Sequence, residues 1–198
     1  MNIHNGEIVA LASSPDFNAN KERGELGKNK DPSIYFNRVV QGVYEMGSTF
    51  KIFSVAQGLE KDLFTLDSLI DTRAFKINSR KIEDKYKFNS ESSIYEIIVR
   101  SSNVGSARLA LMVGEKGLKE IFSKLGLLEP VRLELREANT TRPILPKNWH
   151  DITLATVSYG YGMSVSLLHL AKAYAILGNG GFNICLLYTS PSPRDWTI

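Results

Sequence analysis

The chain has 198 residues, of which 43% are hydrophobic and 23% charged, an ordinary composition for a globular protein. Its net charge of +3 gives no sign of a nucleic-acid-binding surface, and no long basic stripe carries interleaved aromatic residues. One cysteine excludes a disulfide scaffold, and the three scattered histidines do not have metal-ligand spacing. No run approaches a membrane span in length, and the first residues do not form a signal peptide. These numbers indicate one domain, or most of a larger one.

The N-terminal part is predicted to contain one strand and one long loop. Residues 6–15 have the pattern of a turn that leads into a buried strand and stops at a proline. Residues 18–33 are polar and rich in charged residues, asparagine and glycine, which is typical of a surface loop.

A loop running into a helix is predicted for residues 46–53, with Ser48 or Thr49 as its cap and an end near residues 58–61. On a helix, Ser48 and Lys51 are three residues apart and share one face. A serine beside a buried lysine is one form of activated nucleophile, because burial lowers the pKa of the amine. The helix N-terminus adds partial positive charge and N–H groups that could hold an oxyanion. The competing interpretation is a helix cap next to a solvated lysine, since Ser-x-x-Lys is common by chance.

Small strands or an excursion of the chain are predicted for residues 62–90, where short alternating pieces such as 75–77 and 86–88 are separated by charged turns. Lysines and arginines gather here, but Glu83 and Asp84 interrupt them, so a solvated face is the favoured interpretation. Ser93 and Glu96 have the spacing of a capping box, which predicts a short helix with buried isoleucines behind it.

Small polar residues at 101–103 separate two apolar stretches, and the simplest interpretation is a cap for a helix over 104–112. Another helix is expected over 116–125, closed by Gly126. Residues 132–146 are predicted to be irregular, 149–157 helical and 158–162 a glycine-aromatic turn. Ser166 is expected to cap a strong helix over 167–177. After Phe182 no periodicity remains.

These pieces together resemble the transpeptidase domain of class B penicillin-binding proteins. Residues 44–51 (Tyr-Glu-Met-Gly-Ser-Thr-Phe-Lys) are similar to the nucleophile motif, and 101–105 (Ser-Ser-Asn-Val-Gly) to the second motif. Further stretches resemble the first strand region, the residues before the nucleophile and the sequence that precedes the third motif, namely 6–13, 37–38, 159–165, 170–175 and 179–181. The form of the first motif is closer to the division (septal) subgroup than to the elongation subgroup.

The resemblance implies an α+β fold of the β-lactamase-like type, with an antiparallel sheet flanked by helices. It implies that Ser48 attacks the penultimate D-alanine of a peptidoglycan stem peptide and that Lys51 takes the serine proton. It also implies that Ser101 relays a proton towards the leaving amine, and that Asn103 bonds the substrate amide and Lys51. The implied partners are D-Ala-D-Ala stem peptides and β-lactams, and no metal or organic cofactor is expected.

The third family motif, Lys-Thr-Gly or Lys-Ser-Gly, does not occur in the sequence. We therefore expect residues 1–183 to be a partial transpeptidase domain that is itself inactive and lacks the later strands of the sheet. Residues 184–198, including Cys185, are expected to be a non-native tail. For the complete protein, the resemblance implies an anchor in the bacterial inner membrane, a periplasmic catalytic domain and division-machinery partners.

Two other function classes compete with a transpeptidase: a hydrolytic β-lactamase or carboxypeptidase, and a protein of the same fold that senses β-lactams or serves as a scaffold. A class A β-lactamase would have Asp in place of Ser102 and a Glu-x-x-Leu-Asn loop, and this chain has neither. A β-lactam sensor or a non-catalytic scaffold of the same fold is the remaining alternative. A scaffold would not need Ser48, Lys51, Ser101 and Asn103, whereas a sensor keeps the acylation chemistry and would differ in its flanking segments.

Overall fold

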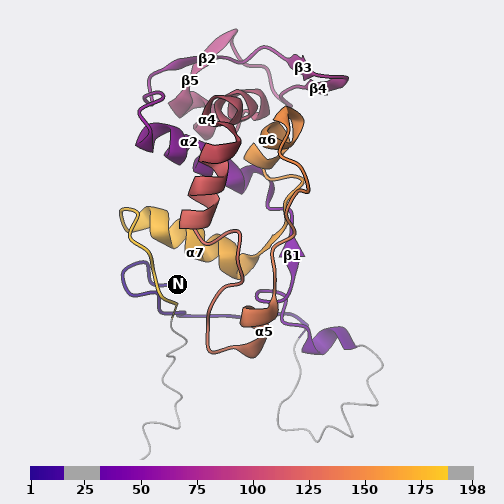
Figure 1. Cartoon of the computed structure of the whole chain (residues 1–198), viewed down its shortest axis with the longest axis vertical. Coiled ribbons are helices and arrows are strands. Elements are labelled where there is room, and N and C mark those ends of the chain that lie inside the picture. Colours follow the sequence, from indigo (N-terminus) through magenta and orange to yellow (C-terminus); the bar gives the residue numbers. More distant parts are fainter. Residues whose placement is uncertain (16–31, 187–198) are drawn as a thin grey trace, which may run out of the picture. The chain divides into compact units, whose positions relative to one another are not determined.

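A computed structural model of the chain describes residues 1–15 and 32–186 (Figure 1). These residues form parts of two compact units: unit 1 comprises residues 1–44, 125–143 and 165–198, and unit 2 comprises 45–124 and 144–164. Within the described ranges, no helix combines the length and the apolar character that a membrane crossing requires.

Unit 2 contains one 3₁₀ helix, four α-helices and two strand pairs. Its elements are η2 (Gly47–Phe50), α2 (Lys51–Glu60), β2 (Leu69–Asp71), β3 (Phe75–Ile77), β4 (Arg80–Ile82), β5 (Glu91–Ser93), α3 (Ile94–Val99), α4 (Asn103–Lys124) and α6 (Asp151–Ser158). The elements of unit 1 are η1 (Pro32–Tyr35), β1 (Val43–Tyr44), α5 (Arg136–Thr140), β6 (Val165–Ser166) and α7 (Leu167–Gly178).

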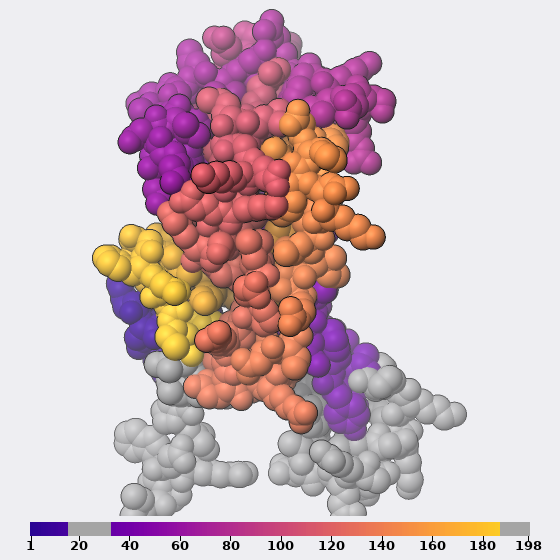
Figure 2. All heavy atoms as spheres, in the orientation of Figure 1, coloured from indigo at the N-terminus to yellow at the C-terminus, as the bar shows by residue number. Residues whose placement is uncertain are grey.

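Helix α4 is the centre of unit 2. It packs on α2 and on α6, and Figure 2 shows its atoms between those of the other two helices on the viewed face. At the α2–α4 contact, Phe50, Phe53 and Phe122 form a cluster with ring centroids 5.1–6.3 Å apart and edge-on or tilted geometry. A second buried cluster, which includes Ile94, Ile97 and Leu109, joins α3 to α4. This packing fixes the two helix starts that carry the candidate nucleophile and second motif.

The helix predictions for unit 2 are confirmed. The two helices expected over 104–112 and 116–125 are the two halves of α4, because Gly114 has φ +72° and ψ 173° and breaks the helical geometry between them. Gly126 follows α4 with φ +70°, as expected for a glycine that closes a helix. Ser93 caps α3 by accepting the Glu96 N–H, but the Glu96 side chain bonds Arg100 instead of completing the capping box.

The strand pairs are short and antiparallel. In unit 2, Leu69 of β2 lies opposite Ser93 of β5, and Phe75 of β3 lies opposite Ile82 of β4. In unit 1, β1 pairs with β6. Helices with small antiparallel sheets agree with the α+β class.

The strand predicted at residues 6–15 is wrong, because the structure has only an isolated bridge at Glu7 there. Ile8 is buried while Val9 is 68% exposed, so the apolar run does not have two covered faces, as the predicted buried strand would. The polar loop predicted for 18–33 lies almost wholly outside the described residues. The irregular segment 132–146 contains one unpredicted short helix, α5.

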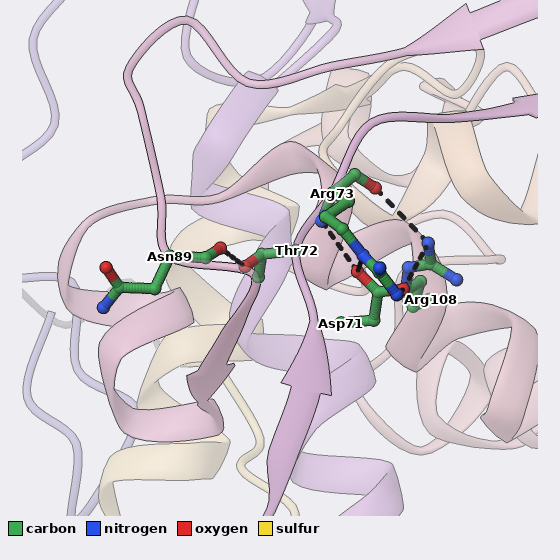
Figure 3. Close-up of polar contacts among 5 residues, drawn as sticks. All are labelled: Asp71, Thr72, Arg73, Asn89 and Arg108. Carbon is green, nitrogen blue, oxygen red and sulfur yellow. Dashed lines mark hydrogen bonds and ion pairs between the residues drawn. The ribbon is translucent and has the colours of Figure 1, made fainter.

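A polar cluster fastens the end of β2 to α4 (Figure 3). Asp71 pairs with Arg73 at 2.8 Å and with Arg108 of α4 at 3.4 Å, and Arg108 also donates to the Arg73 carbonyl at 3.3 Å. The Thr72 hydroxyl donates to the Asn89 carbonyl at 2.6 Å, which connects β2 to the segment before β5. These contacts hold the strands against the helix whose first residues belong to the candidate site.

In unit 1, the polar side chains at the start of α7 are hydrogen-bonded to each other and to a nearby backbone carbonyl. Ser166 caps the helix as predicted and accepts from the His169 N–H at 3.3 Å, and its hydroxyl lies 2.6 Å from His169 Nδ1. His169 Nε2 lies 3.0 Å from the Glu129 carbonyl. Because a carbonyl only accepts, Nε2 carries the proton and Nδ1 accepts from Ser166.

Candidate active site

Ser48 lies in η2, and Lys51 is the first residue of α2, so both occupy the predicted helix start. The prediction that Ser48 or Thr49 caps the helix is wrong, because the N-cap positions of η2 and α2 are Met46 and Phe50, and neither has a side-chain cap hydrogen bond. The Thr49 hydroxyl instead donates to the Met46 carbonyl at 2.8 Å. The Ser48 side chain is therefore left exposed.

The glycine-aromatic turn at 158–162 supports the loop before Ser48. The Gly47 N–H donates to the Gly160 carbonyl at 3.1 Å, and the Gly162 N–H donates to Glu45 Oε1 at 2.6 Å. A Cβ atom on Gly160 would lie 2.0 Å from the Gly47 carbonyl oxygen, and Gly160 has φ +82°. Only glycine allows the two backbones to approach so closely.

Lys51 is the buried amine of the site. Its side chain is only 3% exposed, and its Nζ donates to the Ser101 carbonyl at 2.5 Å and to the Ser101 hydroxyl at 2.8 Å. Burial lowers the pKa of Lys51 from 10.5 to about 8, and the nearby negative charge of Asp84 opposes that shift. A substantial neutral fraction of the amine is then present near pH 8, as a base requires.

In the second motif, two neighbouring residues have different roles: Ser102 caps the helix and Ser101 contacts Lys51. Ser102 is the helix cap: its hydroxyl accepts from the Gly105 N–H at 2.8 Å. Ser101 has φ +60°, a conformation that side chains rarely adopt, and it is exposed with its hydroxyl on Lys51. Backbone strain of this kind is found where a structure must aim a functional group.

A cavity of about 300 Å³ brings all four predicted site residues together. It is lined by Ser48, Lys51, Asp84, Lys85, Tyr86, Phe88, Arg100, Ser101 and Asn103. Within the described ranges, the Ser48 hydroxyl and the Asn103 side chain form no hydrogen bond, so both are available to a bound molecule. Catalytic hydrogen bonds are often loose before a substrate binds.

Five lining residues were missed by sequence reasoning. The strand piece predicted at 86–88 is wrong, because the chain bends after β4 and carries Tyr86 and Phe88 to the cavity. Arg100 closes this side: its guanidinium lies 4.3 Å from the Phe88 ring centroid and donates to the Lys87 carbonyl at 2.7 Å. The solvated-face interpretation holds for the exposed lysines and arginine of this segment, but not for Asp84, which is half-buried. The one sequence feature that could have indicated Asp84 is that it is an acidic residue within a run of basic residues.

Metal chemistry has no candidate ligand set in the part of the chain that the structure describes, since three or more histidine, cysteine or carboxylate side chains do not cluster anywhere in it. A base made from a buried amine and a hydroxyl nucleophile is what the cavity offers.

Comparison with known proteins gives consistent matches. Residues 1–190 match the family model described as "Penicillin binding protein transpeptidase domain". The chain is 41% identical over 181 residues to a probable peptidoglycan D,D-transpeptidase FtsI of Caulobacter vibrioides, covering 91% of this chain and 30% of that protein. It is 32% identical over 193 residues to the peptidoglycan D,D-transpeptidase FtsI of Escherichia coli K12, covering 98% and 32%. The chain thus spans about a third of the length of these relatives.

Two solved structures share the architecture. A crystal structure titled as a peptidoglycan glycosyltransferase from Burkholderia ambifaria has a TM-score of 0.81 at 27% identity, covering 98% of this chain and 56% of that one. The transpeptidase domain of Burkholderia pseudomallei penicillin-binding protein 3 has a TM-score of 0.80 at 26% identity, covering 98% and 53%.

Proposed function

This chain belongs to the penicillin-binding protein transpeptidase family, and on that premise we propose that it carries the serine acyl-enzyme machinery of a division-type peptidoglycan D,D-transpeptidase. The observation that carries the proposal is the buried Lys51 amine, bonded to Ser101 in the cavity that Ser48 also lines. The roles proposed below for Ser48, Lys51, Ser101 and Asn103 are those that the family resemblance implies, and this arrangement supports them.

In the first half-reaction, Ser48 Oγ attacks the carbonyl carbon of the penultimate D-alanine, and its proton passes to neutral Lys51. The amide C–N bond then breaks, and the terminal D-alanine leaves as an amine after it receives a proton. Ser101 is positioned for that transfer, because its hydroxyl already accepts from Lys51 Nζ at 2.8 Å. Asn103 has its side chain in the cavity and holds the substrate amide.

In the second half-reaction, an amine of a neighbouring stem peptide attacks the acyl-enzyme. The ester bond to Ser48 breaks, a new amide cross-link forms, and the amine proton returns through Lys51 to Ser48. A β-lactam enters the same path and stops at the acyl-enzyme, because its ring opens without releasing a leaving group.

For the complete protein we propose the setting of the division-type enzymes: an anchor in the inner membrane, a periplasmic catalytic domain and partners in the division machinery. We also propose that the native transpeptidase sequence runs to about residue 183 and that 184–198 is a non-native tail. The native DNA beyond codon 183 tests this, with a Lys-Thr-Gly expected within several tens of codons. A continuation that encodes residues 184–198 and then no such motif would contradict it.

Fluorescent penicillin tests the acyl-enzyme proposal. We expect the full-length native protein to be labelled at Ser48, with the adduct located by peptide mass spectrometry. The Ser48→Ala variant should lose labelling, while Thr49→Ala, the matched neighbouring hydroxyl, should retain it. Labelling of Ser48→Ala at the wild-type level would overturn the assignment.

A sensor of the same fold would also be labelled, so a second assay separates the two. A transpeptidase releases D-alanine repeatedly from a stem-peptide substrate in the presence of an acceptor amine. A sensor would take up penicillin at Ser48 and release no D-alanine, and that result would favour the alternative.

A further inference from the structure

Asp84 lies two residues after β4, outside the four predicted site residues, yet its carboxylate reaches the N-terminus of α4. Oδ2 accepts from the Ser102 hydroxyl at 2.7 Å. Oδ1 accepts from the Asn103 N–H at 2.5 Å and from the Val104 N–H at 3.2 Å. All three donors belong to the second motif, residues 101–105.

These contacts complete a helix start that one residue cannot satisfy alone. The first N–H groups of an α-helix have no partner within the helix. Ser102 satisfies the Gly105 N–H, and Asp84 satisfies those of Asn103 and Val104. A carboxylate is also favoured electrostatically at this end of a helix, where the partial charge is positive.

The neighbouring residue, Ser101, depends on this anchoring. Its positive φ is sustained only when the structure on both sides fixes the backbone. On the side of α3, the Ser101 N–H donates to the Ile98 carbonyl at 3.2 Å. On the side of α4, the contacts of Asp84 hold the next three residues. Both the carbonyl and the hydroxyl of Ser101 then point at Lys51 Nζ.

We propose that Asp84 is a positioning residue of this site: it locks the start of α4 so that Ser101 contacts Lys51 and Asn103 lines the same cavity. Among the described residues, the hydrogen bonds of Asp84 go to the second motif and not to Ser48 or Lys51, so it acts through that motif. Its relevance to catalysis rests on the proposed function, but the geometric claim stands on the hydrogen bonds alone.

Charge gives Asp84 a second influence on the site. Its carboxylate raises the pKa of Lys51 against the larger lowering caused by burial. The other charged or titratable groups that line the cavity are Lys85, Arg100 and Tyr86. Asp84 is the only acidic side chain in that lining, so its removal leaves Lys51 facing cations and a phenol.

Three variants of the 198-residue chain test the proposal by NMR. Asp84→Asn removes the charge but keeps an acceptor, Asp84→Ala removes both, and Glu83→Gln is the control because it removes the adjacent, exposed carboxylate. The readouts are the titration of Lys51 through a ¹³C label at Cε and the amide resonances of Asn103 and Val104. Far-UV circular dichroism confirms folding of each variant.

We expect Asp84→Asn to lower the pKa of Lys51 below its wild-type value, with the two amide resonances moved moderately. Asp84→Ala should also lower that pKa, and it should move the two amides furthest and speed their exchange with solvent. Glu83→Gln should leave both readouts near the wild type. If Asp84→Asn and Asp84→Ala change them no more than Glu83→Gln does, the proposal is wrong.

This experiment does not depend on acylation. Failure of the full-length protein to be labelled at Ser48 would overturn the proposed function and leave the NMR result to decide the role of Asp84. Should Asp84→Ala fail to fold, the comparison of Asp84→Asn with Glu83→Gln still decides it, since the amide side chain preserves shape and one acceptor.

Discussion

The starts of α4 and α7 are both capped by a buried serine, and the residues on either side of the α4 cap, Ser101 and Asn103, line the candidate-site cavity. At α7, Ser166, His169 and the Glu129 carbonyl form a closed set of hydrogen bonds, and both side chains are about 1% exposed. At α4, Ser102 is equally buried, yet the preceding Ser101 is strained and exposed and contacts Lys51.

A capping serine therefore does not by itself show whether a helix start has a structural or a functional role. The α7 cap is completed by a residue of its own helix, His169. The α4 cap is completed by Asp84, which comes from a different segment and also lies near a buried amine. The cap of α4 uses a carboxylate from another segment of the chain, and the residue before it has a positive φ. We interpret such a cap as one that positions neighbouring side chains.

The largest expected effect concerns the backbone contact that supports the site. In Gly160→Ala, the new Cβ would overlap the Gly47 backbone at a position with φ +82°, so we expect a loss of about 3 kcal/mol or more in unfolding free energy. Gly162→Ala is the control, because φ is +79° but the nearest atom is 3.5 Å away, and strain alone costs about 1 kcal/mol. Urea unfolding measures both, and equal losses would contradict the close-contact argument.

Removing each capping hydroxyl tests directly whether the starts of α4 and α7 differ in this way. Ser102→Ala and Ser166→Ala should each cost about 1–2 kcal/mol, since each leaves a helix N–H and a buried partner without its hydrogen bond. Only Ser102→Ala should also change the NMR titration of Lys51, because Ser102 adjoins Ser101. A change of that titration in Ser166→Ala, or none in Ser102→Ala, would break the distinction between the two junctions.

The α7 cap should respond to acid. Burial lowers the pKa of His169, so the folded state binds its proton less readily than the unfolded chain does. Its stabilising contribution is complete above the unfolded value of about 6.5 and is lost as pH falls below 6.5 towards the folded pKa. We expect urea midpoints of the wild type to fall between pH 7 and pH 5, more steeply than those of His169→Gln.

His4→Gln is the matched control for that measurement, because His4 is exposed. It should keep the pH dependence of the wild type. If His169→Gln keeps it too, the neutral, buried state of His169 is not the cause.

The smallest expected effect concerns a buried polar group that lacks the hydrogen-bond partners found at both caps. Gln57 of α2 is fully buried, and its side-chain amide atoms have no partner among the described residues. Gln57→Met should raise the unfolding free energy by about 1 kcal/mol, since it removes unsatisfied polar atoms at similar volume. Gln41→Met should instead lower it, because Gln41 Oε1 accepts from the Asn37 N–H at 2.9 Å. Loss of stability in Gln57→Met would show that its amide is satisfied.

Much of the helical framework was predictable because it follows from local signals. Apolar spacing and capping residues correctly indicated α2, α3, α6, α7 and both halves of α4 around Gly114. The strand predicted at 6–15 is not formed, and local sequence could not show this, because a strand depends on a partner that local sequence does not reveal. The short helix α5 carries too weak a pattern to be recognised.

Part of the candidate site was predictable because the family motifs mark it. Ser48, Lys51, Ser101 and Asn103 line one cavity, as the resemblance to those motifs implied. Asp84 was not predictable, because its contacts lie 18–20 residues away along the chain and its neighbours look like an ordinary charged turn. The positive φ of Ser101 is likewise set by tertiary contacts and not by its own propensity.

The role of Lys51 as base depends most directly on the protonation state of its amine, which can be measured by titrating the chain labelled with ¹³C at lysine Cε. Burial beside Ser101 predicts a pKa of about 8 for Lys51. A value near 10.5 would mean that the amine is solvated, and it would contradict the claim that Lys51 is the base of this site.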